Sequence, residues 1–356
     1  MAASFEEMLL KKKPLIDKLI EKYIPRKMDR PALEKMCGKA SYDYHAEACQ
    51  KSITEPIWDL LDRGGKRWRP VLFLVVVEAL RGDAKKLQDF CIIPEIVHEG
   101  TLMVDDVEDM SELRRGKPST HLVFGQDIAI NAGNAMYYIP LSVFIRNKDS
   151  VKCETMLSAY EIYMQEMINL SFGQGMDIAW HRGIADADKV TEKQYMQMCA
   201  FKTGTLSRMS AKLAAVLSGA DAMTVEKIGR FAESIGVAFQ IQDDIMDIMC
   251  PEKIGKKFGN DIKEGKRTLM VIHTMQKASE KDRKRLTEIL GRHTDNMNER
   301  KEAIAILHKY GSVEYAIDTA RKIVESSWKE MEKLLPDSDA KDKMKSFADF
   351  AITRKC

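Results

Sequence analysis

The sequence predicts an all-α protein, a large single-domain helical bundle over residues 1–356. No proline occurs between Pro140 and Pro251, and this interval is rich in Met, Ala, Leu, Gln and Glu, which favour helices. Apolar residues there recur in steps of four and three, as on one face of a helix. Alternating strand patterns joined by Asn-Gly or Asp-Gly are absent, so no β-hairpin is expected.

Individual elements follow from the same patterns. Two segments, residues 70–80 and 235–249, are apolar on most sides and are therefore expected as helices in the middle of the bundle. Between them, one face of a further helix is marked by Met156, Tyr160, Tyr163, Met167 and Leu170. No Gly/Ser-rich linker marks a domain boundary, which favours one domain.

Composition excludes several classes of protein. The chain has 356 residues, 45% hydrophobic and 31% charged, so it can bury a large core and is not a disordered protein. Its formal net charge of +2 argues against a nucleic-acid-binding protein, which would usually be strongly basic. The seven cysteines form no zinc spacing. The longest apolar run, residues 71–77, is far shorter than the roughly 20 residues that cross a bilayer, and the N-terminus resembles no secretory signal. A cytoplasmic protein without a transmembrane segment is expected.

Two Asp-Asp-x-x-Asp clusters lie within apolar helical sequence. Their members are Asp105, Asp106 and Asp109, then Asp243, Asp244 and Asp247. The outer aspartates of each cluster share a helix face and can converge on one cation, while the middle ones are rotated by about 100°. Oxygen ligands favour Mg²⁺, which is usually held by one or two carboxylates with water and phosphate. An exposed acidic turn would explain either cluster alone. Carboxylates among apolar residues are costly unless paired or metal-bound, so we expect the two clusters to face each other around a polyphosphate.

Basic residues surround both clusters in the sequence. They occur in GGKRWRP (64–70), Arg114-Arg115, Lys202, Lys256-Lys257 and Lys266-Arg267. Each alone would be read as a solvated surface charge. Together they could bind two phosphate-bearing groups, because Arg grips phosphate with two hydrogen bonds and Lys acts as a mobile point charge. The spacing of a P-loop is absent.

These motifs, in this order, resemble the trans-prenyl diphosphate synthases of the polyprenyl synthetase family. The resemblance covers about residues 60–270 and rests on GGKRWRP, HEGTLMVDDVED, RRGKP, GQGMD with KTG, and FQIQDDIMD followed by GKKFGNDIKEGKRT. It implies a helical bundle of the isoprenoid synthase type with a central active-site cavity, usually a homodimer. It also implies condensation of isopentenyl diphosphate with an allylic diphosphate (dimethylallyl, geranyl or farnesyl), using about two or three Mg²⁺ ions per site, or Mn²⁺ in their place.

The resemblance implies a role for each matching residue. All six aspartates would hold Mg²⁺ on the allylic diphosphate. Its direct cationic contacts would be Arg114, Lys202, Lys256 and Lys266. The isopentenyl diphosphate site would comprise Lys66, Arg69, His98 and Arg115. A lone His on an apolar helix is more often a core residue, and its position in the motif is what favours function for His98. Thr203 and Gln240 would lie near the reacting carbons, with Gln174 and Asp177 at the metal shell.

Product length is suggested by small and aromatic residues near the first cluster. Gly100 and Thr101 lie five and four residues before Asp105, and small residues there would leave a tunnel open beyond a C15 product. The next floor would be Tyr137 and Tyr138, as in geranylgeranyl diphosphate synthases, which the chain resembles most. The prediction is therefore a C20 product. Ser171 stands where those enzymes often carry a bulky His, so a longer product (C25–C40) is the alternative.

Two further alternatives belong to other functional classes. A class I terpene cyclase would share the fold and first motif, but it needs a different metal triad at the second, where Pro251 occupies one position and cannot bind a metal. A non-catalytic partner subunit should have lost acidic or basic contacts, and this chain carries all of them. Activity of the purified chain distinguishes these cases.

Overall fold

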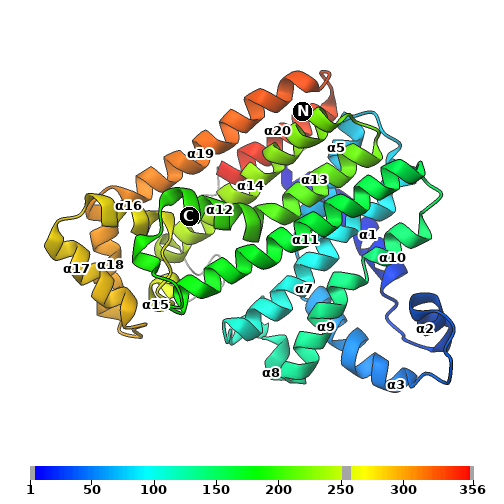
Figure 1. Ribbon diagram of the computed structural model, residues 1–356, viewed down its shortest axis with the longest axis horizontal. Helices are drawn as coiled ribbons and strands as arrows, with labels where there is room; N and C mark the ends of the chain where they lie inside the picture. Colours follow the sequence, from blue (N-terminus) through cyan, green and yellow to red (C-terminus); the bar gives the residue numbers. More distant parts are fainter. Residues whose placement is uncertain (1–4, 251–257, 353–356) are drawn as a thin grey trace. The chain divides into compact units, whose positions relative to one another are not determined.

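The structure is a computed structural model that describes residues 5–250 and 258–352. Helices form nearly all of the regular structure in these residues, so the predicted all-α fold is confirmed (Figure 1). The chain divides into two compact units. Unit 1 comprises Met1–Glu161 and Leu213–Asp221, and unit 2 comprises Ile162–Lys212 and Ala222–Cys356. Because α11 and α13 contain residues of both units, each is given below with unit 2.

The helices that lie wholly within unit 1 are 4 to 19 residues long. In chain order its elements are α1 (Phe5–Tyr23), α2 (Arg30–Cys37), α3 (Ala46–Cys49), the π-helix η1 (Gln50–Thr54), α4 (Glu55–Asp62), α5 (Trp68–Ala79), α6 (Ala84–Leu87), the 3-10 helix η2 (Gln88–Ile92), α7 (Ile93–Glu108), β1 (Leu113–Arg114), β2 (Lys117–Pro118), α8 (Thr120–Phe124), α9 (Gln126–Tyr138) and α10 (Leu141–Arg146). The apolar run predicted as a central helix is confirmed, because every side chain from Val71 to Val77 in α5 is at most 2% exposed.

Helices α7 and α9 pack tightly against each other in unit 1. This contact depends on two glycines: a Cβ at Gly100 would lie 2.7 Å from the Cβ of Met136 and 2.8 Å from the carbonyl oxygen of Gly133. A Cβ at Gly133 would in turn lie 2.8 Å from a methyl group of Val104. Helix backbones can approach this closely only where side chains are missing. The contact therefore fixes α9 against the helix that carries the first aspartate cluster.

One expectation about local structure was wrong. Leu113–Arg114 and Lys117–Pro118 form a small antiparallel hairpin, although the sequence has no Asn-Gly or Asp-Gly turn there. Arg115 and Gly116 occupy the turn, with φ angles of 52° and 75°. A two-residue hairpin turn of this kind needs positive φ at both positions, which Gly adopts easily and Arg does not. Side-chain contacts of Arg115, described below, accompany this unfavourable backbone.

Unit 2 is built on long helices that run beside one another. Its elements are α11 (Cys153–His181), the 3-10 helix η3 (Ala187–Lys189), α12 (Glu192–Cys199), the π-helix η4 (Ala200–Gly204), α13 (Thr205–Leu217), α14 (Ala222–Met249), α15 (Asn260–Lys263), α16 (Leu269–Lys277), α17 (Glu280–Gly291), α18 (Met297–Lys309), α19 (Ser312–Met331), the 3-10 helix η6 (Glu332–Leu334) and α20 (Asp339–Ile352). Helix α14, which carries the second aspartate cluster, packs against α19 and η4 (Figure 1). Thr191 and Gln194 form a reciprocal capping box that begins α12.

Within the described residues, one helical stretch, Gln126–Arg146, is long and apolar enough to cross a membrane by those two criteria alone. Core helices of soluble proteins satisfy the same criteria, so the stretch is weak evidence for a membrane span.

Candidate active site

The first aspartate cluster lies at the C-terminal end of α7. Asp106 is 1% exposed and accepts hydrogen bonds from Arg114 Nε at 2.9 and 3.1 Å, while Asp105 lies 3.6 Å from Arg114 Nη2. Burial raises the pKa of Asp106, against the opposing hydrogen bond and charge of Arg114. Asp105 and Asp109 are partly exposed, one helical turn apart. The cluster thus has one buried carboxylate that orients Arg114 and two outer carboxylates nearer to solvent.

The residues predicted to bind isopentenyl diphosphate lie in the same unit. Lys66 is exposed, whereas Arg69 is buried to 8% exposure with its guanidinium carbon 4.7 Å from the ring centroid of Trp68. Burial, followed by the charges of Arg69 and Arg115, holds the pKa of His98 well below its usual value. His98 is therefore neutral near neutral pH, in a strongly positive environment that suits a diphosphate.

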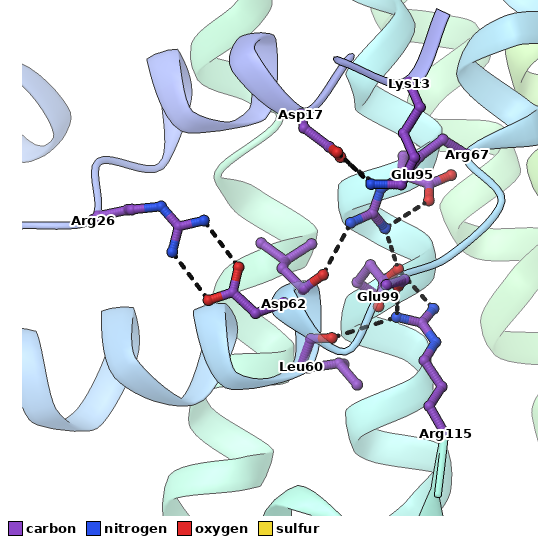
Figure 2. A network of polar contacts seen from close by, with 11 residues as sticks. Lys13, Asp17, Arg26, Leu60, Asp62, Arg67, Glu95, Glu99 and Arg115 are labelled. Carbon is purple, nitrogen blue, oxygen red and sulfur yellow. Dashed lines mark hydrogen bonds and ion pairs between the residues drawn. The ribbon is translucent and has the colours of Figure 1, made fainter. Parts of the chain in front are cut away.

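A buried ionic network, which was not predicted from the sequence, involves Arg67 of the GGKRWRP loop and Arg115 of the hairpin (Figure 2). Arg67, 3% exposed, donates to Asp17 at 3.1 Å, to Glu95 at 3.1 Å and to Glu99 at 2.7 Å. Arg115 donates to the same oxygen of Glu99 at 2.8 Å. Glu95 and Glu99 are four residues apart on α7, so they share a face of that helix. The spacing of these two glutamates in the sequence could therefore have indicated a shared basic partner.

Most of the residues predicted to set the length of the product lie on α7 and α9, around the contact between these helices. Gly100 is buried in that contact, and the Thr101 hydroxyl donates to the backbone oxygen of His98 at 2.7 Å. Tyr137 lies 3.3 Å from the Cβ position of Gly100. Burial raises the pKa of Tyr137, with smaller effects of Glu108 and Asp105 in the same direction. Tyr138, by contrast, is 71% exposed.

The second aspartate cluster, on α14 in unit 2, has a different environment for each carboxylate. Asp243 is partly exposed. Asp244 accepts hydrogen bonds from the Tyr195 hydroxyl at 2.7 Å and from Gln240 Nε2 at 2.9 Å. Asp247 is fully buried and accepts a hydrogen bond from the backbone N–H of Asp261 at 3.0 Å. Asp247 thereby joins α14 to the segment that begins α15.

Predicted residues from four separate segments gather in unit 2. Lys202 donates to Asp177 at 2.6 Å, and the Thr203 hydroxyl donates to Gln240 Oε1 at 2.7 Å. Lys266 lies 3.9 Å from Asp261. A small cavity is lined by Asp177, Trp180, His181, Tyr195, Met198, Lys202, Gln240, Asp244, Lys266, Arg267 and Thr268. Burial would raise the pKa of Asp177, but the charges of Lys202 and Lys266 outweigh it and lower that pKa.

Two of the remaining predicted residues, Gln174 and Ser171, lie on α11. Gln174 is partly buried on α11. Ser171 is exposed on the same helix, and its hydroxyl donates to the backbone oxygen of Met167 at 3.1 Å. Lys256, like Pro251, lies outside the described residues.

The carboxylates fit a hard cation that brings its own ligands. Within residues 5–250 and 258–352, no three His, Cys, Asp or Glu side chains form a ready-made metal cluster. The donors are nevertheless carboxylate oxygens, and Asp105 and Asp109 are one turn apart at a helix end. Mg²⁺ needs only one or two protein carboxylates when phosphate and water supply the rest. The donor set therefore suits Mg²⁺ bound together with a phosphate substrate.

Comparison with known proteins agrees with these features. The profile of the polyprenyl synthetase family matches residues 50–307, which include both aspartate clusters and all of the basic residues predicted to bind diphosphate. The chain belongs to the polyprenyl synthetase family. A short chain isoprenyl diphosphate synthase of Methanothermobacter thermautotrophicus is 36% identical over 83% of this chain and 88% of its own length. A geranylgeranyl diphosphate synthase of Saccharolobus solfataricus is 31% identical over 86% of this chain and 91% of its own.

Solved structures show that this polyprenyl synthetase shares its fold with other such enzymes. The crystal structure of a geranylgeranyl pyrophosphate synthetase from Pyrococcus horikoshii Ot3 matches with a TM-score of 0.84 and 30% identity, over 99% of this chain and 98% of that one. The corresponding enzyme from Geoglobus acetivorans matches with a TM-score of 0.79 and 27% identity, over 99% and 100%. The predicted isoprenoid synthase type of fold is confirmed.

Proposed function

We propose that this polyprenyl synthetase condenses isopentenyl diphosphate with an allylic diphosphate to make a trans-polyprenyl diphosphate, with geranylgeranyl diphosphate (C20) as the main product. The proposal depends chiefly on the cavity in unit 2. There Lys202, Lys266, Gln240 and Asp244, which are widely separated in sequence, surround one small polar space. Cations beside carboxylates suit a diphosphate that binds with divalent metal ions.

The chemistry requires no protein nucleophile. Loss of diphosphate from the allylic substrate leaves a carbocation, and the double bond of isopentenyl diphosphate attacks it. Negative charge develops on the diphosphate as its bond to carbon breaks, so fixed positive charge accelerates this step. Mg²⁺ ions bound by Asp105 and Asp109 in unit 1, and by Asp243 in unit 2, would supply part of that charge. Lys202 is oriented by Asp177 and adds a cation in unit 2.

In unit 1, Asp106 orients the guanidinium group of Arg114, which would bind a phosphate group. Its hydrogen bonds to this buried carboxylate fix the guanidinium direction, and Asp106 raises the pKa of Arg114 against the effect of burial. Thr203 and Gln240 in unit 2 are joined by a hydrogen bond and present oxygen atoms at fixed positions. Such oxygens could stabilise positive charge on carbon. Proton loss from the adduct completes the reaction, and the released pyrophosphate is a suitable base.

The C20 product is supported by Tyr137 and by the named relatives. Tyr137 lies against α7, whose end carries Asp105, so its ring occupies space beneath the first cluster. Relatives named geranylgeranyl diphosphate synthase include the enzymes of Saccharolobus solfataricus and Methanosarcina mazei, each 31% identical. Tyr138 is exposed in this chain, so Tyr137 is the stronger candidate for the wall of the tunnel.

We also propose that the protein is a homodimer in the cytoplasm. Support for the dimer comes from large apolar side chains exposed on three consecutive helices of unit 1, namely Leu122, Val123, Ile130, Tyr138 and Ile145. We infer that these side chains lie at the subunit interface, because exposed apolar residues are common at such interfaces. Sedimentation of the purified chain would show a mass near twice 40.5 kDa if the proposal holds, and near 40.5 kDa if it does not.

An aspartate variant tests the proposed function. Asp243→Ala should abolish Mg²⁺-dependent condensation while leaving the helical circular dichroism spectrum intact. Asp337→Ala is the matched control, because Asp337 is a fully exposed aspartate of the same unit that pairs with Lys341. Near-normal turnover by Asp243→Ala would contradict the proposed role of the second cluster. Absence of turnover in the unchanged chain would instead favour a non-catalytic partner subunit, and a cyclic hydrocarbon product would favour a terpene cyclase.

A further inference from the structure

A single carboxylate oxygen lies at the junction of the two basic loops of unit 1. Glu99 Oε1 accepts a hydrogen bond from Arg67 Nη1 at 2.7 Å and another from Arg115 Nη2 at 2.8 Å (Figure 2). Arg67 belongs to the GGKRWRP loop and Arg115 to the RRGKP hairpin. The Glu99 side chain is fully buried, and its second oxygen has no hydrogen-bond partner among the described residues. A buried carboxylate with one unsatisfied oxygen is costly, so its retention calls for a specific use.

Arg115 uses only part of its hydrogen-bonding capacity within the protein. Its Nη1 donates to the backbone oxygens of Leu60 and Gly64, and its Nη2 donates to Glu99. These contacts use three of the five N–H donors of a guanidinium. The remaining two, on Nε and Nη2, have no partner among the described residues, and the side chain is 22% exposed. The group is therefore fixed in orientation while two donors stay available for an anionic ligand.

The backbone supports the same assignment. Arg67 and Arg115 both have φ of 52°, a left-handed conformation that residues with a Cβ adopt rarely. Only three other non-glycine residues in the described ranges do so. Both guanidinium groups also lie over Gly65, where a Cβ would be 3.0 Å from Arg67 Nη1 and 3.4 Å from Arg115 Nη2. Strained residues persist where their surroundings hold them, and here the side chains of both converge on Glu99.

We propose that Glu99 is a positioning residue for the diphosphate of isopentenyl diphosphate. It ties the two basic loops together and presents the remaining donors of Arg115 to the substrate. This inference rests on the proposed function, since it deepens the predicted role of Arg115. The charge of Glu99 alone would repel a diphosphate, so its orienting effect must outweigh that repulsion. The sign of the affinity change on removing the charge therefore separates orientation from simple electrostatics.

The test compares two isosteric variants on one helix. Glu99→Gln weakens the contacts to both arginines, whereas Glu95→Gln is a matched control because Glu95 contacts Arg67 and not Arg115. We expect Glu99→Gln to raise the KM for isopentenyl diphosphate about fivefold or more, with kcat and the KM for farnesyl diphosphate changed less than about twofold. Glu95→Gln should change each constant less than about twofold. Calorimetric titration of the metal-free protein with isopentenyl diphosphate alone should show the same loss of affinity.

Several results would overturn the assignment. One is tighter or unchanged binding of isopentenyl diphosphate by Glu99→Gln, and another is an equal loss in both variants. In an Arg115→Lys background, Glu99→Gln should have little further effect, since both act through one group, and additive losses would count against the proposal. If Glu99→Gln does not fold, Glu99→Asp replaces it. Its shorter carboxylate cannot reach both arginines and should also weaken binding, whereas unchanged affinity would overturn the assignment. The proposed condensation fails separately if the unchanged chain binds isopentenyl diphosphate without forming product.

Discussion

Gly173 is predicted to set the position of the π-helical turn that carries Lys202 and Thr203. A Cβ at Gly173 would lie 2.3 Å from the backbone nitrogen of Lys202 and 2.6 Å from the backbone carbon of Phe201. These atoms belong to the main chain of η4, so rotation of a side chain cannot relieve the clash. Gly175 is on the same helix, two residues later, and a Cβ there would meet nothing within 4 Å. The pair Gly173→Ala and Gly175→Ala therefore isolates the contact.

The expected magnitude follows from two opposing effects. Either substitution improves helix propensity by about 1 kcal/mol. In Gly173→Ala, moving the clashing atoms to ordinary contact requires a shift of about 1 Å, and overpacking of this kind costs about 1–3 kcal/mol. The free energy of unfolding should thus be about 1–3 kcal/mol lower for Gly173→Ala than for Gly175→Ala. A shift of that size at Lys202 should also reduce kcat by about tenfold to a hundredfold.

Urea unfolding followed by circular dichroism measures the first quantity, and steady-state turnover measures the second. Similar m-values for both variants would show that the difference lies in the native state. If both variants have the same stability and the same kcat, the close approach of α11 to η4 does not position Lys202, and the reasoning is refuted.

Three further predictions concern single groups of the site. Asp243→Ala should lose Mg²⁺-dependent condensation while Asp337→Ala keeps it, as measured by incorporation of labelled isopentenyl diphosphate. His98 has a lowered pKa in the folded protein, so below about pH 6.5 the unfolded chain binds more protons at this residue than the folded chain does. The free energy of unfolding should therefore decrease as the pH decreases, by up to about 1.4 kcal/mol per pH unit. His98→Gln should lose this component, and parallel stability curves for variant and parent between pH 7 and about pH 5 would contradict the lowered pKa of His98. Tyr195→Phe removes the donor 2.7 Å from Asp244 and should cost about 1–3 kcal/mol in urea unfolding, and no loss would show that Asp244 does not depend on it.

Sequence patterns predicted what depends on local spacing. The period of a helix places Asp106 and Asp244 away from the outer aspartates, and in the structure these two bind Arg114 and Tyr195. Partners that come from distant segments were beyond such reasoning. Glu99 was not among the predicted site residues, because only the folded chain brings Arg67 and Arg115 to it.

The missed hairpin has the same origin. Two-residue hairpin turns favour Asn-Gly or Asp-Gly, which adopt positive φ readily. Arg115-Gly116 forms such a turn here, and the side-chain contacts of Arg115 with distant segments accompany its positive φ. Asp247 gives a further example. Its spacing from Asp243 predicts a shared cation, but the spacing alone did not show that the fold buries Asp247 completely against the backbone N–H of Asp261. Helix periodicity fixes which residues share a face, while long-range packing decides which of them reach solvent.

The proposed synthesis of geranylgeranyl diphosphate is tested by product analysis of the purified chain. The chain would be incubated with Mg²⁺, labelled isopentenyl diphosphate and one allylic primer at a time, of C5, C10, C15 or C20 length, and the dephosphorylated products would be sized by chromatography. We expect Mg²⁺-dependent formation of a C20 alcohol from the C5, C10 and C15 primers, with little extension of the C20 primer. Incorporation that does not require a divalent cation, or products of C25 and longer from every primer, would contradict the proposal.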